Sequence, residues 1–589
     1  MPKCYIRDYP RPQMVRKNFV LLNGRWKFAF DPQNYGEKKG WIKGIPTSSE
    51  IEVPFSPESV KSGICDLTNN KIIWYCREYQ FPHSSEERVY LIFEGVDYFA
   101  DLWVNGQFIG NHRGGYSRFS FDITDSLDNN GNAMIVLRAR DGFSKEILRG
   151  KQRWKNEVYD CWYTQTTGIW KNVWAETISC ENIQDIQIIP SFDDGTVEFG
   201  ISLLHNEDAT PLVLQTIISF DSVEIYCGSD IIKTNYLKKT VALHNSHFKW
   251  DVQTWIPEHP NLYDVEFILY KDKQEIDRVG SYFGLRKITT AGGRICLNNQ
   301  QTYLRMVLDQ GYWKDSLLTP PDEDSIISDL KKIKDYGYNG VRKHQKIEDE
   351  RFYYWADVLG LFVWCECPSA YSFTERMNSN ITIEWLNIIK QNQNHPSIIV
   401  WVLFNESWGV PKIYSSEQQQ NLTKALYYLT KTLDPTRLVV SNDGWEHTCS
   451  DIVSLHDYAE DYTTLRKHLE KINSILQNRD TLNGEKFAFS CNHRYEGQPI
   501  ILSEFGGIAF GTAKGWGYGK TEDNDLGYLA RLKGLFAAIY ESDILCGFCF
   551  TQLTDVIQEV NGHMTMERQD KKSPDIIRNI ITGKQTLCE

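Results

Sequence analysis

The chain has 589 residues, which is enough for three or four domains of roughly 100–200 residues, or fewer if one of them is a barrel. Its net charge is −13 and no basic stripe interleaves with aromatic residues, so we expect no nucleic acid partner. No apolar run reaches the length of a membrane span, so we expect no membrane partner either.

The N-terminal segment and the cysteines indicate a reducing compartment. Residues 1–19 are polar and lack the apolar stretch of a signal peptide, which predicts a cytoplasmic protein, with a mature or trimmed form as the alternative. The 14 cysteines have no regular spacing and form no zinc-like Cys/His set, so we expect free thiols, no metal and no cofactor. The sequence CGFC at Cys546–Cys549 lies in an apolar run, which favours a buried strand over a redox motif.

The first half of the chain is predicted to be β-structure. Residues 1–180 contain short alternating runs such as RVYLIFEGV and AMIVLRAR, and VNGQ at Val104–Gln107 is a tight hairpin signal. This pattern predicts a β-sandwich. Residues 181–288 contain about seven further strand-like runs in about 100 residues, which is typical of an immunoglobulin-like β-sandwich.

From residue 289 the pattern alternates between apolar runs and amphipathic segments. Eight runs are predicted to be strands: TYLRMVLD, NGVRKH, LFVWCE, SIIVWVLFNE, RLVVSND, DIVSLHDY, QPIILSEF and ILCGFCFT. Helices are expected over DEDSIISDLKKIKDYG and ERFYYWADVLG, after a capping box of Ser415 and Gln418, and near Asp525–Glu541. Residues 289–589 are therefore predicted to form a (β/α)8 TIM barrel with its active site at the carboxyl ends of the strands.

Two acidic residues end predicted barrel strands. Glu406 ends the fourth strand and Glu504 ends the seventh, each after an apolar run. An unpaired buried charge is costly, so each carboxylate is either functional or held in a structural salt bridge. Enzymes that cleave glycosidic bonds use two carboxylates that face each other across the bond. A pair of carboxylates at a barrel mouth therefore favours the functional interpretation.

Longer motifs occur in each of the three regions. LNGRWKFAFD and TGIWKNVW lie in the first, YFGLRKI ends the second, and NQNHPSIIVWVLFNES and ILSEFGG lie in the third. In this order and spacing, the motifs resemble glycoside hydrolase family 2, which contains β-galactosidases, β-glucuronidases and β-mannosidases. The resemblance implies an N-terminal jelly-roll β-sandwich, the immunoglobulin-like domain and the TIM barrel. It also implies a carbohydrate substrate, and it leaves open a homo-oligomer.

The resemblance assigns roles to residues that match the family's motifs. It implies that Glu406 is the acid/base, Glu504 the nucleophile and Asn405 a ligand of the sugar 2-hydroxyl. It further implies that His344 contacts the sugar, that Arg342 supports the nucleophile and that Tyr458 orients it. We also expect sugar contacts from Asp309 and Glu366, which close predicted strands, and from Trp516 in a Gly-rich segment.

The acid/base and the nucleophile need opposite pKa shifts. We expect Trp401, Phe404 and Trp408 to raise the pKa of Glu406 by restricting water. A nearby arginine and a tyrosine hydroxyl are expected to lower the pKa of Glu504.

Departures from the family pattern bear on specificity. Several members of the family place an Asp of the sugar pocket a few residues before the Gly of GIW, and here Tyr163 or Gln165 stands near that position. The Asn-x-Lys element that binds a glucuronide carboxylate is missing after Glu504. A β-galactosidase-like retaining exo-β-glycosidase is therefore the leading prediction. β-Glucuronidase or α-L-arabinopyranosidase activity and a catalytically silent carbohydrate-binding protein stay open. Three residues after the eighth strand either line the pocket or cap the barrel rim: Gln552, Asp555 and Glu559.

Overall fold

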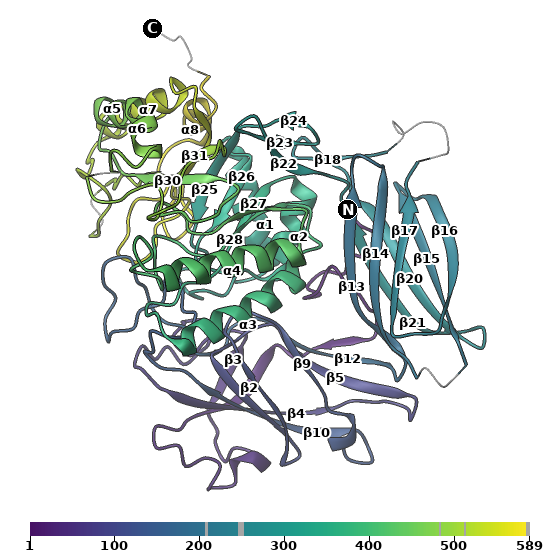
Figure 1. The fold of residues 1–589 in the computed structure, drawn as a ribbon. Coiled ribbons are helices and arrows are strands. Elements are labelled where there is room, and N and C mark those ends of the chain that lie inside the picture. Colours follow the sequence, from purple (N-terminus) through teal and green to yellow (C-terminus); the bar gives the residue numbers. More distant parts are fainter. Residues whose placement is uncertain (207–209, 245–251, 482–483, 512–513, 585–589) are drawn as a thin grey trace.

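A computed structural model describes residues 1–589 except 207–209, 245–251, 482–483, 512–513 and 585–589. It contains two β-sandwiches and a barrel (Figure 1). The N-terminal sandwich lies below the barrel in this view and the middle sandwich lies beside it. The predicted fold class is thus confirmed.

The N-terminal sandwich packs a six-stranded sheet, β3-β2-β4-β10-β7-β8, against a four-stranded sheet, β1-β12-β5-β9. Alternate side chains of both sheets form one apolar core, with Trp26, Tyr75 and Phe93 fully buried. The strands and short 3-10 helices are β1 (Phe19–Leu21), β2 (Gly24–Phe30), η1 (Trp41–Lys43), β3 (Glu50–Val53), β4 (Ile72–Gln80), β5 (Glu87–Phe93), β6 (Val96–Asp97), β7 (Phe99–Val104), β8 (Gln107–Arg113), β9 (Phe119–Asp122), η2 (Thr124–Ser126), β10 (Asn132–Arg140), β11 (Gly168–Ile169) and β12 (Val173–Ser179).

The middle sandwich packs β13-β14-β17 against β16-β15-β20-β21. Its core is aromatic and aliphatic, and includes Phe199, Phe267 and Phe283. The strands are β13 (Asn182–Ser191), β14 (Thr196–Leu204), β15 (Leu212–Phe220), β16 (Val223–Ile232), β17 (Tyr236–Ala242), β18 (Trp255–Ile256), β19 (His259–Pro260), β20 (Tyr263–Lys271) and β21 (Gln274–Phe283).

The barrel consists of eight parallel strands in the order β29-β28-β27-β26-β25-β32-β31-β30. A small antiparallel sheet precedes it, and the side chains of Ile288, Ile295 and Leu297 pack with the barrel strands. This sheet is formed by β22 (Ile288–Ala291), β23 (Arg294–Leu297) and β24 (Gln300–Gln301). The barrel strands are β25 (Leu304–Asp309), β26 (Gly340–Lys343), β27 (Phe362–Glu366), β28 (Ile398–Val402), β29 (Leu438–Val440), β30 (Val453–Asp457), β31 (Ile500–Gly506) and β32 (Leu545–Thr551).

Helices cover the outside of the barrel. They are α1 (Glu323–Asp335), α2 (Glu350–Leu359), α3 (Glu375–Asn392), α4 (Glu417–Leu433), α5 (Tyr462–Glu470), α6 (Ile472–Leu476), α7 (Asp525–Tyr540) and α8 (Pro574–Ile581). One predicted boundary is wrong: Ser416, not Ser415, caps α4, because its extended backbone lets its hydroxyl accept from Gln419 N. In the described part of the chain, no helix is long and apolar enough to cross a membrane.

The N-terminal sandwich contributes to the barrel surface. The carboxylate of Glu384 on α3 accepts a 2.7 Å hydrogen bond from Tyr116 N, and Arg149 N donates to Ser369 O at 3.0 Å beside the end of β27. The loop after Arg149 therefore reaches the carboxyl ends of the barrel strands. The 13 described cysteines are free, and Cys546 and Cys549 lie buried on β32 as predicted.

Candidate active site

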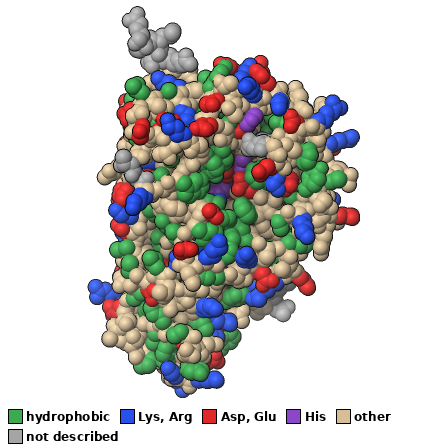
Figure 2. All heavy atoms as spheres, turned by 90° about the vertical axis from the view of Figure 1, so that its left-hand side faces the viewer, with side chains coloured by type: hydrophobic (Ala, Val, Ile, Leu, Met, Phe, Trp, Pro, Cys, Tyr) green, Lys and Arg blue, Asp and Glu red, His purple; other side chains and the backbone are tan. Residues whose placement is uncertain are grey.

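Charged side chains converge at the carboxyl ends of the barrel strands. Figure 2 shows the face of the molecule that lies on the left in Figure 1. Acidic and histidine side chains gather there in a hollow bordered by hydrophobic side chains. Glu406 follows β28, and Glu504 lies in the last part of β31. An oxygen of Glu406, an oxygen of Glu504 and a ring nitrogen of His456 all lie within 4.8 Å of one another.

The backbone around Glu406 bends sharply as it leaves the barrel. Glu406 and Ser407 have φ values of 50° and 60°, in the left-handed region that side chains other than glycine rarely adopt. The bend is held by two backbone hydrogen bonds with Asp443, from Glu406 N at 2.9 Å and to Phe404 O at 2.7 Å. It turns Glu406 from the strand direction toward the barrel mouth.

Arg342 is the central cation of the site. Its guanidinium is fully buried and donates to Glu504 Oε1 at 2.7 Å, Glu366 Oε2 at 2.8 Å and Asn405 Oδ1 at 2.8 Å. Its Nη2 also lies 2.7 Å from Asp443 Oδ2. The planar fork of arginine can satisfy several acceptors at once, so this single side chain fixes both the Asn405 amide and the Glu504 carboxylate.

Glu504 is held in its ionised form. Burial opposes the charge, but His456 and Arg342 outweigh it and lower the pKa of Glu504. Tyr458 donates a hydrogen bond of 2.6 Å to Glu504 Oε2, while Arg342 occupies Oε1. Both oxygens are therefore positioned, and the carboxylate is ready to act as a base or a nucleophile.

His456 is the partner of Glu406. Its Nδ1 lies 2.9 Å from Glu406 Oε1 and its Nε2 lies 3.2 Å from Asp443 Oδ2. Burial opposes protonation, but Glu504 and Asp443 raise the pKa of His456 to about 10. The imidazolium in turn outweighs the burial of Glu406 and lowers its pKa to about 2.

The expectation that aromatic residues raise the pKa of Glu406 is therefore wrong for the site as it stands. Trp401 points away from Glu406: its indole donates to Asp434 Oδ2 at 2.8 Å and packs edge-on against Trp385 of α3. A strand turns alternate side chains to opposite faces, and Trp401 occupies the face toward the helices. The charge of His456 dominates over the apolar surroundings.

His344 and Glu366 border the nucleophile. His344 Nδ1 lies 3.2 Å from Glu366 Oε1 and 3.9 Å from Glu504 Oε1. Burial holds the pKa of His344 well below its usual value, so the ring is neutral. Burial also raises the pKa of Glu366 to about 7, against the influence of Arg342.

Two other predicted sugar-binding residues do not join this cluster. Asp309 accepts from Lys343 Nζ at 2.6 Å and from Gly311 N at 2.8 Å, so its carboxylate belongs to a separate ion pair. Trp516 lies on the rim, where its indole donates to Asp160 O at 3.0 Å. Its ring contacts Tyr518 edge-on at 5.4 Å, and Tyr518 stacks on Tyr458 at 3.3 Å.

The segments around the eighth strand combine with the N-terminal domain. Tyr163 OH donates to Glu559 Oε2 and accepts from Gln310 Nε2 at 2.8 Å. Gln310 also donates to Gln552 Oε1 at 3.0 Å. Gln165 instead accepts from Arg153 Nε at 2.6 Å. Of Tyr163 and Gln165, the two residues near the position of the family's pocket Asp, Tyr163 is therefore the one that faces the barrel mouth.

Asp555 caps the barrel rim. It accepts hydrogen bonds from Lys571 Nζ at 2.6 Å and from Gly562 N at 2.8 Å, so its carboxylate is engaged away from the acidic pair. Of the two interpretations left open for this residue, the structural one fits these contacts.

Sequence reasoning missed four residues near the acidic pair. His456 precedes Tyr458 in the same LHDY motif, and Asp443 follows β29 in SND, so both had a signal at a strand end. Tyr518 lies two residues after Trp516 in the Gly-rich segment. Lys151 comes from the N-terminal domain, and only the domain packing brings it near Glu406.

The cluster of Glu406, His456 and Glu504 has the ligand types of a metal site. The same atoms are also those of an ion-paired cluster, because His456 Nδ1 lies 2.9 Å from Glu406 Oε1 and 3.5 Å from Glu504 Oε2. The imidazolium itself supplies the positive charge between the acids. Ion pairing therefore accounts for the geometry of this cluster.

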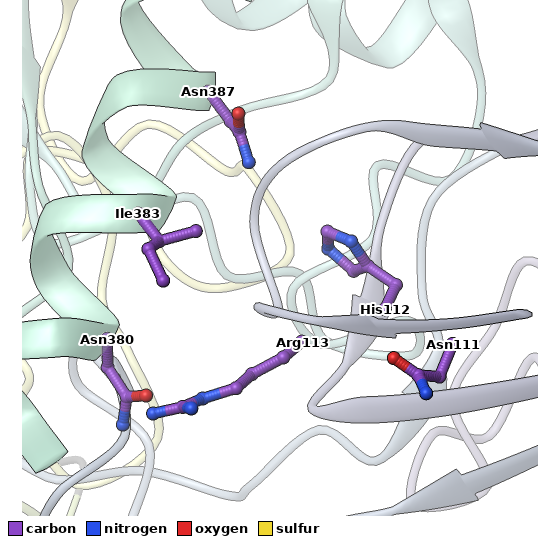
Figure 3. Close-up of a pocket in the computed structure, with 6 residues that line it drawn as sticks. All are labelled: Asn111, His112, Arg113, Asn380, Ile383 and Asn387. Carbon is purple, nitrogen blue, oxygen red and sulfur yellow. The ribbon is translucent and has the colours of Figure 1, made fainter.

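A second pocket of about 170 Å³ lies away from the barrel mouth, between β8 and α3 (Figure 3). Its lining residues are Asn111, His112, Arg113, Asn380, Ile383 and Asn387. Burial lowers the pKa of His112 to about 4, and no acid is among the lining residues. This pocket lacks the paired carboxylates that make the barrel mouth the candidate active site.

The fold and the site define a class of three-domain barrel proteins with two carboxylates at the barrel mouth. Three family models match the chain: the sugar binding domain of glycosyl hydrolases family 2 over residues 19–175, the family 2 domain over 181–286, and the family 2 TIM barrel domain over 288–525. The chain belongs to glycosyl hydrolases family 2.

The curated relatives of this chain are named for different activities. A putative beta-glucuronidase of Formosa agariphila is 28% identical over 374 residues, covering 62% of this chain and 44% of the relative. A beta-galactosidase of Leuconostoc mesenteroides is 23% identical over 524 residues, covering 82% of this chain and 47% of the relative. The chain spans about half the length of the curated relatives it matches.

Solved structures match the whole fold. A GH2 beta-galacturonidase from Eisenbergiella tayi has a TM-score of 0.76 and 19% identity, with 98% of each chain covered. The beta-glucuronidase of Ruminococcus gnavus has a TM-score of 0.78 and 17% identity, covering 98% of this chain and all of that one. At this level of identity the similarity establishes the three-domain fold.

Proposed function

We propose that the protein is a retaining exo-β-glycosidase that removes a terminal sugar from an oligosaccharide or glycoside. The observation that carries this proposal is the close approach of Glu406 and Glu504, whose oxygens lie within 4.8 Å. Retaining enzymes hold their two carboxyl groups about 5–5.5 Å apart, whereas inverting enzymes need about 6.5–9.5 Å to fit a water molecule. One oxygen of each carboxylate thus lies closer than the inverting range, which supports the retaining arrangement.

The two carboxylates have distinct roles in the first step. Glu504 attacks the anomeric carbon through a carboxylate oxygen, and the bond from that carbon to the glycosidic oxygen breaks. Glu406 delivers a proton to the departing oxygen, so the aglycone leaves as an alcohol. His456 holds a proton against Glu406 at 2.9 Å, and the pair together provides the proton that the leaving group takes.

The second step returns the enzyme to its starting state. After the Glu406–His456 pair has given up its proton, the Glu406 carboxylate removes a proton from water, which restores the proton of the pair, and the water oxygen attacks the anomeric carbon. The ester bond to Glu504 breaks, and the sugar is released with its original anomeric configuration. Arg342 and Tyr458 stabilise the carboxylate that leaves, because they donate to its two oxygens.

Asn405 is well placed to bind the sugar 2-hydroxyl. Its Oδ1 accepts from Arg342, which fixes the amide orientation, and its buried Nδ2 has no hydrogen-bond partner among the described residues. A buried donor without a partner is costly, and a sugar hydroxyl would satisfy it. Hydrogen bonds to the 2-hydroxyl strengthen in the transition state of this reaction.

The glycon is a terminal β-linked pyranoside. A β-galactoside is the first candidate, since the relatives include beta-galactosidases and the barrel lacks an Asn-x-Lys element after Glu504. A β-uronide is the second candidate, because other relatives are named beta-glucuronidases and a buried lysine, Lys151, lies in the loop that reaches the barrel mouth. An α-L-arabinopyranoside would present the same ring hydroxyls as galactose without C6.

A direct assay distinguishes the proposed glycosidase from the alternative, a catalytically silent carbohydrate-binding protein. The purified chain is incubated with aryl β-galactosides, β-uronides and α-L-arabinopyranosides, and with matching 2-fluoro sugars. We expect release of the phenol, covalent labelling of Glu504 by the 2-fluoro sugar, and loss of activity by at least about 10³-fold in Glu504→Ala. Turnover that survives in Glu504→Ala would refute the assigned nucleophile. Binding of sugar without any turnover would favour the silent protein.

A further inference from the structure

Lys151 is a buried cation that the N-terminal domain extends to the barrel mouth. The loop that carries it is anchored by a 2.8 Å hydrogen bond from Tyr163 N to Lys151 O. The preceding Gly150 has φ 59°, and a Cβ there would stand 2.2 Å from Gln345 O at the end of β26. Only glycine allows this close approach, which brings the lysine from one domain to the strand ends of another.

The ammonium group of Lys151 has few partners. It carries three donors, and its one hydrogen bond within the described part of the chain goes to Cys161 Sγ at 3.3 Å. Among the described residues, no carboxylate lies within ion-pairing distance of this ammonium group. Lys151 is nevertheless buried, with only 8% of its surface exposed. Burial raises the pKa of Cys161 to about 11, so this partner is a neutral thiol and a weak acceptor. Two of the three donors therefore remain without an acceptor among the described residues. Because buried lysines are normally paired, these donors are available to a bound group.

The environment keeps Lys151 charged. Burial opposes the charge, but Cys161 and then Tyr371, Glu406 and Glu504 raise the pKa of Lys151 above its usual value. Lys151 also lowers the pKa of His344, across the same hollow. Glu559 does not neutralise it by contact, because its oxygens accept from Tyr163 and Asn561.

We propose that Lys151 is a specificity residue that binds the carboxylate of a uronic acid glycon, so that the enzyme acts on hexuronides. This inference rests on the proposed glycosidase function, and it selects the β-uronide over the β-galactoside as the glycon. A carboxylate is the acceptor that matches a buried ammonium without a counter-ion, since each partner removes the other's unpaired charge. The interdomain lysine would do the work of the carboxylate-gripping element that the barrel lacks after Glu504.

A competing role for Lys151 is electrostatic support of Glu406 and Glu504 with no contact to the sugar. The two roles differ in one measurable respect. A supporting charge affects the cleavage of every glycoside equally, whereas a recognition residue affects only glycosides that carry the group it binds. Substrate pairs that differ only at C6 therefore separate them.

The experiment compares 4-nitrophenyl β-D-galactopyranoside with its galacturonide, and the β-D-glucopyranoside with its glucuronide. Wild-type protein is expected to prefer one of the uronides. In Lys151→Met, kcat/KM for that uronide should fall about 10- to 100-fold more than for its neutral partner, which is the range for a charged hydrogen bond. Lys151→Arg should retain part of the preference, because it keeps the charge. The exposed Lys155 in the same loop provides the control, and Lys155→Met should change neither rate.

The other outcomes are also decisive. A wild-type enzyme that cleaves only the neutral glycosides, or a Lys151→Met variant that loses both activities equally, would overturn the role of Lys151 while the proposed function stands. A wild-type protein that cleaves no glycoside would overturn the proposed function itself. Thermal melting of each variant identifies a loss of activity that comes from unfolding, and Lys151→Arg then serves as the test.

Discussion

His456 Nδ1 lies 2.9 Å from Glu406 Oε1, and its other ring nitrogen lies 3.2 Å from Asp443 Oδ2. The imidazolium is thus inserted between a buried carboxylate and the proposed acid/base. Titration of Glu406 and His456 is coupled, because the proton in their hydrogen bond belongs to the pair. The pH dependence of activity should therefore report the pair rather than either side chain alone.

Replacement of His456 by glutamine should narrow the pH profile. His456 lowers the pKa of Glu406 to about 2 and has itself a pKa raised to about 10. Without the imidazolium, Glu406 alone must hold the catalytic proton, and a carboxyl group releases it at lower pH than the pair does. The alkaline limb of kcat/KM should move to lower pH. The acidic limb should move to higher pH, since His456 also lowers the pKa of Glu504.

The control for this change is His468, which pairs with Asp457 at 2.8 Å outside the site. His468→Gln should leave both limbs in place. An alkaline limb that stays unchanged in His456→Gln would exclude the coupled pair as the proton source.

Glu406→Ala should discriminate between leaving groups. A 2,4-dinitrophenolate leaves without protonation, whereas an alkoxide needs the proton that Glu406 delivers. Loss of a general acid costs typically 10²–10⁴-fold, so we expect a loss in that range for an alkyl glycoside and a much smaller loss of glycosylation rate for the dinitrophenyl glycoside. Pre-steady-state rates measure the first step. Equal losses for both substrates would mean that Glu406 does not act as the acid.

The sequence predicted the barrel because parallel strands are buried on both faces and read as apolar runs. Seven of the eight predicted runs contain a whole barrel strand, and the run QPIILSEF contains all of β31 except Gly506. The capping error at Ser415 arose because two adjacent serines offer the same side chain, and only the backbone conformation selects Ser416. The sequence pattern does not single out helix α3, although its N-cap, Thr374, accepts a hydrogen bond from Met377 N.

The site was less predictable than the fold. Glu406 and Glu504 stand at strand ends in recognisable motifs, so spacing was enough to nominate them. The prediction for Trp401 fails because residues close in sequence alternate between the two faces of a strand. The contribution of Lys151 depends on how the N-terminal domain packs against the barrel, which no local pattern encodes. Asp309 also ends a predicted strand, but Lys343 of the neighbouring strand β26 donates a hydrogen bond to its carboxylate.

Tyr458→Phe should weaken the nucleophile without removing it. The phenol donates a 2.6 Å hydrogen bond to Glu504 Oε2, and such a bond favours the ionised carboxylate. Its loss should raise the pKa of Glu504, move the acidic limb of kcat/KM to higher pH, and reduce kcat about 10- to 100-fold. Tyr518 stacks on Tyr458 at 3.3 Å and keeps the ring in place, so the phenylalanine ring should fit. An acidic limb at the wild-type position would show that the hydroxyl does not tune Glu504.

Arg342→Met should destabilise the barrel in a pH-dependent way. Removal of the guanidinium leaves Glu366, Asp443 and Glu504 buried together without their common cation, which costs about 3–5 kcal/mol for one such broken pair. Arg342 lowers the pKa of both Asp443 and Glu504, so the stability that it supplies through them is present above their ordinary pKa values and is lost as the pH falls through the lowered ones. The difference in melting temperature between wild type and variant should be largest at pH 7 and smaller at pH 3, because the loss begins once the pH is below the ordinary pKa values of about 4. Arg342→Lys keeps the charge but not the fork, so its melting temperature should lie between the two. A difference that is the same at both pH values would place the effect in packing rather than in the charges around Arg342.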